Sequence, residues 1–146
     1  MDFIKIKFGT DIKEIQRDIE RLMDEVFDLR RPFILTRPSR WIPEADIYET
    51  EEEVVIVVNL AGVNKDDIEV FLYDEYIYIR GIRNQPVEDI LKYHKLEIEY
   101  GEFERAFKIP AAVDRESIDA IWKDGFLMIR MRKYKPIPRT IKVEVR

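Results

Sequence analysis

The sequence predicts an all-β protein, an antiparallel β-sandwich with a helix before it and an extended tail after it. Residues 44–133 form a series of short apolar or alternating segments, separated by turn signals and without a helical period. Segments of this kind are typical of sandwiches. Residues 11–31 have instead the period of an amphipathic helix, and residues 134–146 alternate like a strand that has nothing after it to pair with.

Short strands account for the central region. Val54–Val58 is a continuous β-branched run, as expected of a strand covered on both faces. The Asp-Gly pair in Lys123-Asp124-Gly125 favours the positive φ angles of a type I′ turn and predicts a tight hairpin. Gly81 is expected to end one strand, and Gly101 to precede another. The eight expected strands are Ala45–Glu49, Val54–Val58, Ile68–Tyr73, Tyr76–Arg80, Tyr93–Tyr100, Phe103–Ile109, Ser117–Trp122 and Phe126–Met131.

A helix is expected over residues 11–31. Thr10 or Asp11 offers a cap at its start, and Pro32 marks its end. Its apolar residues recur at three- and four-residue steps and form one stripe, which needs a partner surface because it is apolar while the other side is charged. The stripe consists of Ile12, Ile15, Ile19, Leu22, Met23 and Val26.

The expected organisation is an N-terminal helical or irregular arm (1–42), the β-sandwich domain (43–133) and a C-terminal tail (134–146). Residues 32–43 contain three prolines and no period, which predicts an irregular linker. Prolines also stiffen the start of the tail, because each fixes φ and removes a hydrogen-bond donor. A stiff tail favours docking on another subunit over folding back on its own domain.

Composition excludes most common enzyme classes. The chain of 146 residues has no Cys and one His, so a thiolate zinc site, a Cys nucleophile and a poly-His metal site within one chain are ruled out. His94 is expected to lie exposed or at the edge of the core rather than to act as a general base. Neither Ser39 nor Ser117 lies in a G-x-S-x-G motif, and the scattered glycines form no phosphate-binding loop. We therefore expect no catalytic residue, no metal and no cofactor.

Hydropathy and composition also indicate a location and a habitat. No apolar run approaches the length that spans a bilayer, and the first residues lack the apolar stretch of a signal peptide, so we expect a cytoplasmic protein. Abundant Ile, Glu, Lys and Arg with scarce Asn and Gln predict a thermophile. A melting midpoint inside the mesophile range of about 45–65 °C would count against that expectation.

Charge is unevenly spread along the chain. Residues 43–108 carry seven Lys or Arg against seventeen Asp or Glu, whereas residues 126–146 carry seven against one. A basic tail on an acidic body favours contact with a neighbouring copy. Basic residues interleaved with aromatics can also bind nucleic acid, but an acidic body repels phosphate, so nucleic acid is not expected as a partner.

Residues 41–133 closely resemble the alpha-crystallin domain of the small heat shock proteins. The first matching segment fits the family's P-x-x-D-I-x-E opening, and the fourth fits its A-x-x-x-N-G-V-L signature. Ala61 stands where the family usually has proline, and Met131-Arg132-Lys133 replaces its apolar-Pro-Lys ending. The segments that carry the resemblance are WIPEADIYE (41–49), LAGVNKDDIEV (60–70), YGEFERAFKIP (100–110), AIWKDGFL (120–127) and, in the tail, IKV (141–143).

The resemblance implies an immunoglobulin-like sandwich and an ATP-independent chaperone, a holdase that captures partly unfolded client proteins and works as a large homo-oligomer. Such clients expose apolar patches, which an apolar surface binds without a sequence code. The N-terminal stripe either binds clients or packs between subunits. The candidates for this surface are the six stripe residues with Phe3, Ile4, Phe8, Phe27, Phe33 and Trp41.

The resemblance also implies a dimer made by strand exchange. Lys92–Ile98 is expected to project onto the first strand of the second subunit. Arg105 falls at the family's strand-borne arginine and is expected to pair with an acidic residue across the dimer, the alternative being an ordinary surface salt bridge. The expected dimer contacts are Arg105, Tyr93, Leu96, Ile98 and Ile47.

The tail motif Ile141-Lys142-Val143 is expected to dock in a groove of a neighbouring subunit. Ile141 and Val143 supply the apolar side chains, and Val143-Glu144-Val145 offers a second register. The groove is expected between two strands, lined by Ile68, Val70, Leu72, Ile118, Ala120 and Trp122.

The runner-up function is a co-chaperone or adaptor module that binds one defined protein. Such modules share the sandwich, but they typically lack the hairpin signature together with an I-x-V tail. Mass separates the two functions, because an adaptor is monomeric or dimeric and a holdase is a large oligomer. Neither function requires stable insertion into a membrane.

Overall fold

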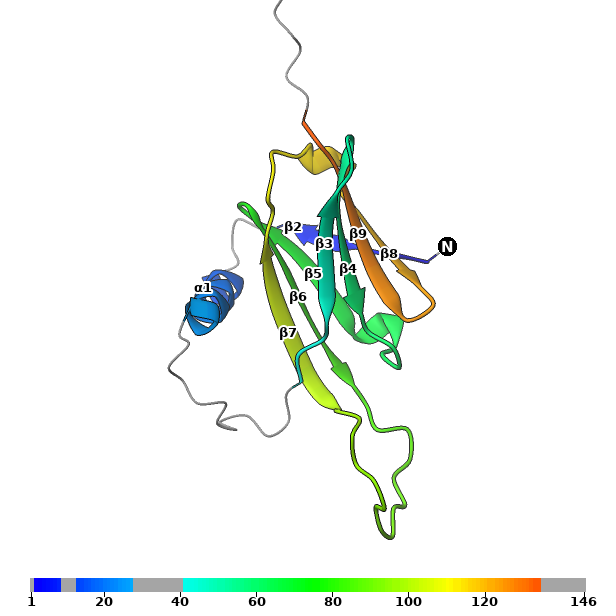
Figure 1. Ribbon diagram of the computed structural model, residues 1–146. Helices are drawn as coiled ribbons and strands as arrows, with labels where there is room; N and C mark the ends of the chain where they lie inside the picture. Colours follow the sequence, from blue (N-terminus) through cyan, green and yellow to red (C-terminus); the bar gives the residue numbers. More distant parts are fainter. Residues whose placement is uncertain (1, 9–12, 28–40, 135–146) are drawn as a thin grey trace, which may run out of the picture.

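Two β-sheets pack face to face in the computed structural model, which describes residues 2–8, 13–27 and 41–134 (Figure 1). One sheet has the strand order β1-β8-β9-β4-β3 and the other β2-β5-β6-β7. The strands are β1 (Asp2–Ile4), β2 (Ile6–Phe8), β3 (Ala45–Glu49), β4 (Glu53–Asn59), β5 (Ile68–Tyr73), β6 (Tyr76–Arg83), β7 (Gly101–Lys108), β8 (Asp119–Lys123) and β9 (Phe126–Arg132). One helix, α1 (Lys13–Phe27), and two short 3-10 turns complete the described elements.

The core lies between the sheets. Alternate residues of each strand point inward, so apolar side chains of β4, β5, β6 and β9 meet there without contact with water. β4 is covered on both faces as its composition predicts, since Val55 on the outer face is buried as well. The fully enclosed side chains include Val54, Ile56, Val58, Leu60, Ile77, Ile79, Leu127, Ile129 and Met131.

The hairpin between β8 and β9 confirms the Asp-Gly prediction. Asp124 and Gly125 have φ angles of 53° and 81°, the two positive values that a type I′ turn requires. Trp122 and Leu127 pair across this turn, which sets the register of the two strands. The turn therefore fixes which residues of β8 face the core.

Gly81 does not end a strand, contrary to the sequence prediction. β6 continues through it to Arg83, and a Cβ at Gly81 would lie 2.6 Å from the ring of Phe103 and collide with the carbonyl oxygen of Asp67. Glycine is needed here because the backbone and a neighbouring ring approach closely, not because the chain turns.

The strand expected at Tyr93–Tyr100 is absent. Residues 84–100 contain no helix or strand and form a loop that projects from the end of the sandwich (Figure 1). A strand requires a neighbour for its backbone hydrogen bonds, and the expected neighbour belongs to a second subunit. The segment therefore alternates like a strand without pairing as one within its own chain.

The helix lies on the outer face of the β5-β6-β7 sheet (Figure 1). Ile15 and Ile19 are almost completely buried there against Phe71 and Tyr78. The partner surface that the stripe needs is thus the chain's own sheet. The residues packed around this contact are Leu22, Met23, Tyr73, Tyr76 and Ala106.

Candidate functional site

The six residues expected to line the tail groove do lie together. They are on or just before β5 and β8, the strands next to the edge strands β2 and β1 on one side of the sandwich. Ile68, Val70 and Leu72 of β5 are buried, as are Ile118 and Ala120, while Trp122 is half-buried. The groove is covered by the chain's own first residues, which sequence reasoning did not predict to form strands. Ile141 and Val143 lie outside the described residues.

Residues 2–8 close this groove by alternation. Ile4 stands opposite Ala120 in β1, and Ile6 stands opposite Val70 in β2. Both isoleucines are buried and belong to the main core, whereas Lys5 between them is exposed. The chain crosses at Lys5 from one sheet to the other, so two short strands cap both sheet edges.

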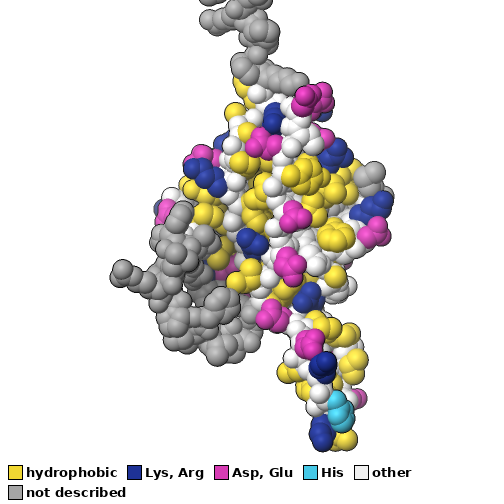
Figure 2. All heavy atoms as spheres, in the orientation of Figure 1, with side chains coloured by type: hydrophobic (Ala, Val, Ile, Leu, Met, Phe, Trp, Pro, Cys, Tyr) yellow, Lys and Arg dark blue, Asp and Glu magenta, His cyan; other side chains and the backbone are white. Residues whose placement is uncertain are grey.

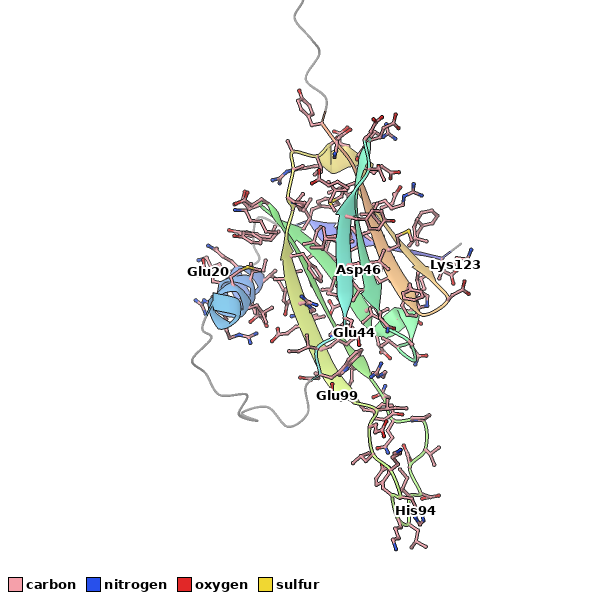
Figure 3. The ribbon with its side chains drawn as sticks, in the orientation of Figure 1. Glu20, Glu44, Asp46, His94, Glu99 and Lys123 are labelled. Atoms are coloured by element: carbon pink, nitrogen blue, oxygen red, sulfur yellow. The ribbon has the colours of Figure 1, made fainter. Side chains whose placement is uncertain are left out.

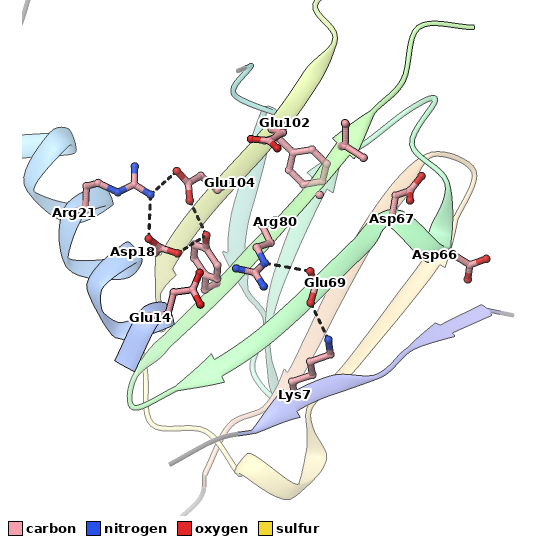
Figure 4. A pocket seen from close by; sticks show the side chains of 14 residues that line it. Lys7, Glu14, Asp18, Arg21, Asp66, Asp67, Glu69, Arg80, Glu102 and Glu104 are labelled. Atoms are coloured by element: carbon pink, nitrogen blue, oxygen red, sulfur yellow. Dashed lines mark hydrogen bonds and ion pairs between the residues drawn. The ribbon is translucent and has the colours of Figure 1, made fainter. Parts of the chain in front are cut away.

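An ion pair holds the second of these strands. The Lys7 ammonium lies 2.8 Å from a Glu69 carboxylate oxygen, whose other oxygen accepts a bond from Arg80 at 3.2 Å (Figure 4). The hydrogen bond from Lys7, followed by that from Arg80, lowers the pKa of Glu69 despite partial burial. The side chains of Lys7 and Glu69 are partly exposed, so their ion pair adds little stability and either partner can pair with another charged group instead.

The expected dimer residues lie at exposed positions. Tyr93, Leu96 and Ile98 are 46%, 66% and 63% exposed in the projecting loop, and Ile47 is 42% exposed on β3. β3 is an edge of its sheet. Figure 2 shows hydrophobic side chains gathered on the loop, and Figure 3 places His94 near its tip and Glu99 near its base. This chain alone leaves an apolar segment and an unpaired strand edge facing solvent.

Arg105 is half-buried on β7, which is an edge strand of the β2-β5-β6-β7 sheet. Its Nη1 donates to the Pro43 carbonyl at 3.0 Å, and its guanidinium lies 4.7 Å from the centre of the Phe107 ring. Desolvation lowers its pKa, because burial disfavours the charged form. Within the ranges that the structure describes, Arg105 makes no ion pair.

Arg83 anchors the base of the projecting loop, a role that no sequence pattern indicated. Its Nε and Nη2 donate to the Glu99 carbonyl, and its Nη1 donates to the Ala61 carbonyl at 3.0 Å. Its guanidinium stacks 3.7 Å from the centre of the Trp41 ring. Trp41, a candidate for the client surface, is instead buried, with Nε1 donating to the Gly101 carbonyl at 2.9 Å. Both ends of the loop are therefore tied to the sandwich.

The described part of the helical stripe faces the sheet. Ile15 and Ile19 are buried, and Leu22 and Met23 are half-buried. Of the other N-terminal candidates, Phe3 and Phe8 are exposed. Ile12 and Phe33, and the side chains of Val26 and Phe27, lie outside what the structure describes.

A polar cluster borders the contact between helix and sheet. Arg21 lies 2.6 Å from a Glu104 carboxylate oxygen, and the other oxygen accepts a hydrogen bond from the Tyr78 hydroxyl at 2.6 Å (Figure 4). Asp18 lies within 3.5 Å of the same hydroxyl. Burial, then the bond to Glu104, raises the pKa of Tyr78 far above its ordinary value. The phenol is thus held neutral in the folded protein.

Replacing Tyr78 by phenylalanine is expected to change stability at alkaline pH. The raised pKa means that the folded state keeps a proton that the unfolded state loses. The contribution of Tyr78 is complete below its ordinary pKa of about 10 and falls above it, by up to about 1.4 kcal/mol per pH unit. Urea unfolding between pH 8 and about pH 11 should show a shallower decline for Tyr78→Phe.

Tyr134→Phe is the control for this measurement, because Tyr134 is 63% exposed. It should retain the decline of the parent protein. Equal slopes for Tyr78→Phe and the parent protein would contradict the role assigned to the buried phenol.

An open pocket between α1, β2 and the β5-β6-β7 sheet is lined mainly by carboxylates (Figure 4). Three basic side chains offset seven acidic ones: Lys7, Arg21 and Arg80 against Glu14, Asp18, Asp66, Asp67, Glu69, Glu102 and Glu104. Over the described ranges, no group of His, Asp and Glu is placed to hold a metal ion. The lining side chains of this pocket are joined by several ion pairs, and the pocket lies beside α1 and β2.

No helix in the described part of the chain is long and apolar enough to cross a membrane. The features that stand out in the described part of the chain are the space between β5 and β8 that residues 2–8 cover, the edge of β3, the projecting loop and the helix-covered sheet face.

Comparison with known proteins agrees with this arrangement. A relative from Rickettsia felis, small heat shock protein C2, is 30% identical over 142 residues, which cover 91% of this chain and 92% of the relative. A probable 15 kDa heat shock protein of Leptospira interrogans is 34% identical, covering 71% of this chain and 78% of the relative. A solved small heat-shock protein from Xylella fastidiosa has a TM-score of 0.61 at 31% identity, over 70% of this chain and 96% of that one.

The match to the family model is more extensive than any one motif. The model of the Hsp20/alpha crystallin family matches residues 46–146, which include every strand from β4 to β9. The antiparallel sandwich is the fold of these relatives. The chain therefore belongs to the Hsp20/alpha crystallin family of small heat shock proteins.

Proposed function

We propose that this protein is an ATP-independent holdase, which binds partly unfolded proteins and works as a large homo-oligomer of strand-exchanged dimers. Its family consists of small heat shock proteins, generally chaperones and not enzymes. The observation that carries the proposal is the exposed apolar loop together with the edge strand β3 among the described residues, because proteins rarely leave such surfaces without a partner.

The strand exchange rests on two complementary parts. Residues 92–98 alternate like a strand but form no strand ladder in the described part of the chain, and β3 is the last strand of its sheet. Addition of this segment to β3 of a second copy satisfies both. Arg105, desolvated and without an ion pair in the described ranges, then has a place beside the acidic groups of that copy.

Higher assembly rests on the tail. Its Ile-x-Val motif fits the apolar groove between β5 and β8, and its basic residues complement the acidic body. Weak contacts repeated around a closed assembly reinforce one another. The solved relative from Xylella fastidiosa is described as having a distinct high order structure, which supports assembly as a property to test here.

The N-terminal arm is the proposed client surface. The helical stripe packs on Phe71 and Tyr78, and separation of α1 from the sheet would expose apolar groups on both sides of the contact. A client with exposed apolar patches then replaces the helix as the partner of that face. Phe3 and Phe8 of the N-terminal arm, which are already exposed, add further apolar area.

The direct test combines mass with protection. The purified chain is sized by light scattering and then heated, without ATP, with an enzyme that aggregates on heating. A holdase keeps the enzyme in solution and elutes with it as a large complex. A monomer or dimer that leaves the enzyme to precipitate would contradict the proposal, and tight binding of one defined partner at that mass would favour an adaptor.

Deleting residues 1–31 is expected to weaken protection of the heated enzyme, because it removes the helical stripe and both exposed phenylalanines. The sandwich should remain folded, since its core is built mainly from β4 to β9. Light scattering of the heated enzyme measures protection, and circular dichroism checks the fold. Gln16→Ala with Glu20→Ala, on the exposed side of α1, is the control and should protect as the parent does. Full protection by the truncated chain would move the client surface to the sandwich.

A further inference from the structure

The groove between β5 and β8 is already occupied within a single chain. The segment of residues 2–8, here named the N-terminal plug, pairs with β8 through β1 and with β5 through β2. Its Ile4 and Ile6 are 9% and 8% exposed and pack among the residues that line the groove. The groove that would accept a tail is thus filled from inside.

The plug and the tail motif have the same chemistry. Ile4-Lys5-Ile6 and Ile141-Lys142-Val143 each place one lysine between two branched apolar residues, and both continue with alternating charged and apolar residues. In the plug this alternation sends the isoleucines inward and Lys5 outward. The tail motif, in the same pose, buries Ile141 and Val143 and leaves Lys142 in solvent.

We propose that the N-terminal plug is an internal competitor of the C-terminal tail, so that the tail of a second copy docks only where the plug has left the groove. This inference rests on the proposed function, because it assumes that the tail seeks the groove. The two segments exclude each other, since both use the free backbone groups of β5 and β8 and the same apolar space.

The plug is built to be displaced. Each of its strands is three residues long, and its ion pair, Lys7 with Glu69, joins partly exposed side chains. Apart from Ile4 and Ile6, the residues of the main core come from other elements, so departure of the plug uncovers the groove and leaves most of the core in place. The tail also brings positive charge to β5, where Asp66 and Asp67 precede the strand and Glu69 lies within it.

Competition reduces the apparent affinity of the groove for a tail to the intrinsic affinity multiplied by the fraction of time that the plug is undocked. A plug docked nine-tenths of the time weakens tail binding tenfold. Conditions that loosen the plug therefore favour assembly, and conditions that hold it favour smaller species. The plug makes the size of the assembly adjustable without a change in the groove itself.

The test measures tail binding to a chain whose own tail is disabled. The background is the full chain with Ile141→Ser and Val143→Ser, and the probe is a fluorescent peptide with the sequence of residues 134–146. Adding Ile4→Ser and Ile6→Ser should tighten peptide binding at least tenfold, measured by anisotropy. Phe3→Ser with Phe8→Ser is the matched control, because both side chains belong to the plug but are exposed, and it should leave the affinity unchanged.

A reversible lock tests the same point in one protein. Phe3 and Ile121 are directly opposed in the β1–β8 ladder, at a spacing that a disulfide can bridge, and the chain has no Cys of its own. In the same background, Phe3→Cys with Ile121→Cys should lose peptide binding on oxidation and regain it on reduction. The disulfide experiment also tests the competition between plug and tail if the variant with Ile4→Ser and Ile6→Ser does not fold.

The outcomes separate the two proposals. Equal peptide affinity with and without the plug isoleucines, or undiminished binding to the oxidised lock, overturns the competitor and leaves tail docking intact. Absence of binding even when the plug is disabled overturns tail docking, and the competitor with it. A peptide with serine in place of Ile141 and Val143 should bind none of the proteins. Binding by this peptide would also overturn the competitor, because the contact would not need the motif.

Discussion

Replacing Ile141 and Val143 by alanine is expected to reduce a large assembly to dimers. Each tail then loses two branched side chains, whose burial contributes about 1.5–3 kcal/mol apiece. Because every subunit both offers a tail and accepts one, the loss recurs at each junction and the closed assembly comes apart. The proposed dimer contact, between β3 and the projecting loop, does not involve the tail and should survive. Light scattering at several protein concentrations measures the change in mass.

Two controls make this result specific. Ile137→Ala removes an apolar residue from the same tail but outside the motif, and should leave the mass unchanged. Val145→Ala tests the second register, Val143-Glu144-Val145. A loss of mass with Val145→Ala that equals the loss with Ile141→Ala would place the docking one step along the tail. An unchanged mass in the double variant would refute tail docking.

Local signals carried the sequence prediction where the structural partner lies close in the chain. Asp124 and Gly125 determine a turn by their own conformational preferences, and the alternation in Ile68–Tyr73 determines which side of β5 faces the core. The helical period of residues 11–31 likewise predicts α1. In each case the residues that form the element also contain its signal.

The prediction failed where the decisive neighbour is distant. The prediction that Gly81 ends a strand is wrong because the ring that requires a glycine there belongs to Phe103, on another strand. Tyr93–Tyr100 is predicted to be a strand, but it forms no strand ladder with the described part of the chain. Ile4-Lys5-Ile6 is too short to show a period, and its partners lie more than sixty residues away in β5 and farther in β8. Sequence patterns do not encode such contacts.

The site divides in the same way. The six groove residues were found because the resemblance placed them on two strands that do lie together, and the sandwich needs their apolar side chains in any case. The occupant of the groove was missed because a two-isoleucine motif has little statistical weight. Sequence reasoning did not find Arg83, because its three hydrogen bonds go to two backbone carbonyls, which carry no sequence signature. A sequence identifies the side chains that can form a bond, but it does not show which backbone carbonyls accept one.

Introducing aspartate at Leu96 and Ile98 is expected to convert the dimer into monomers. Both side chains are largely exposed in the single chain, so the charge costs the folded monomer almost nothing. In the dimer they would lie against β3 of the other subunit, where an unpaired carboxylate is expensive to desolvate. Sedimentation velocity in the tail-variant background, which is expected to be dimeric, should show the lower mass.

Leu91→Asp is the matched control, because Leu91 is the most exposed large hydrophobic residue of the same loop and lies before the expected exchanged strand. It should remain dimeric. If Leu96→Asp with Ile98→Asp also remains dimeric, the contact must use another edge. The plug closes the sheets at β8 and β5, so β7 with its half-buried Arg105 becomes the remaining open edge. Loss of the dimer on replacing Arg105 by alanine would then assign the contact to β7.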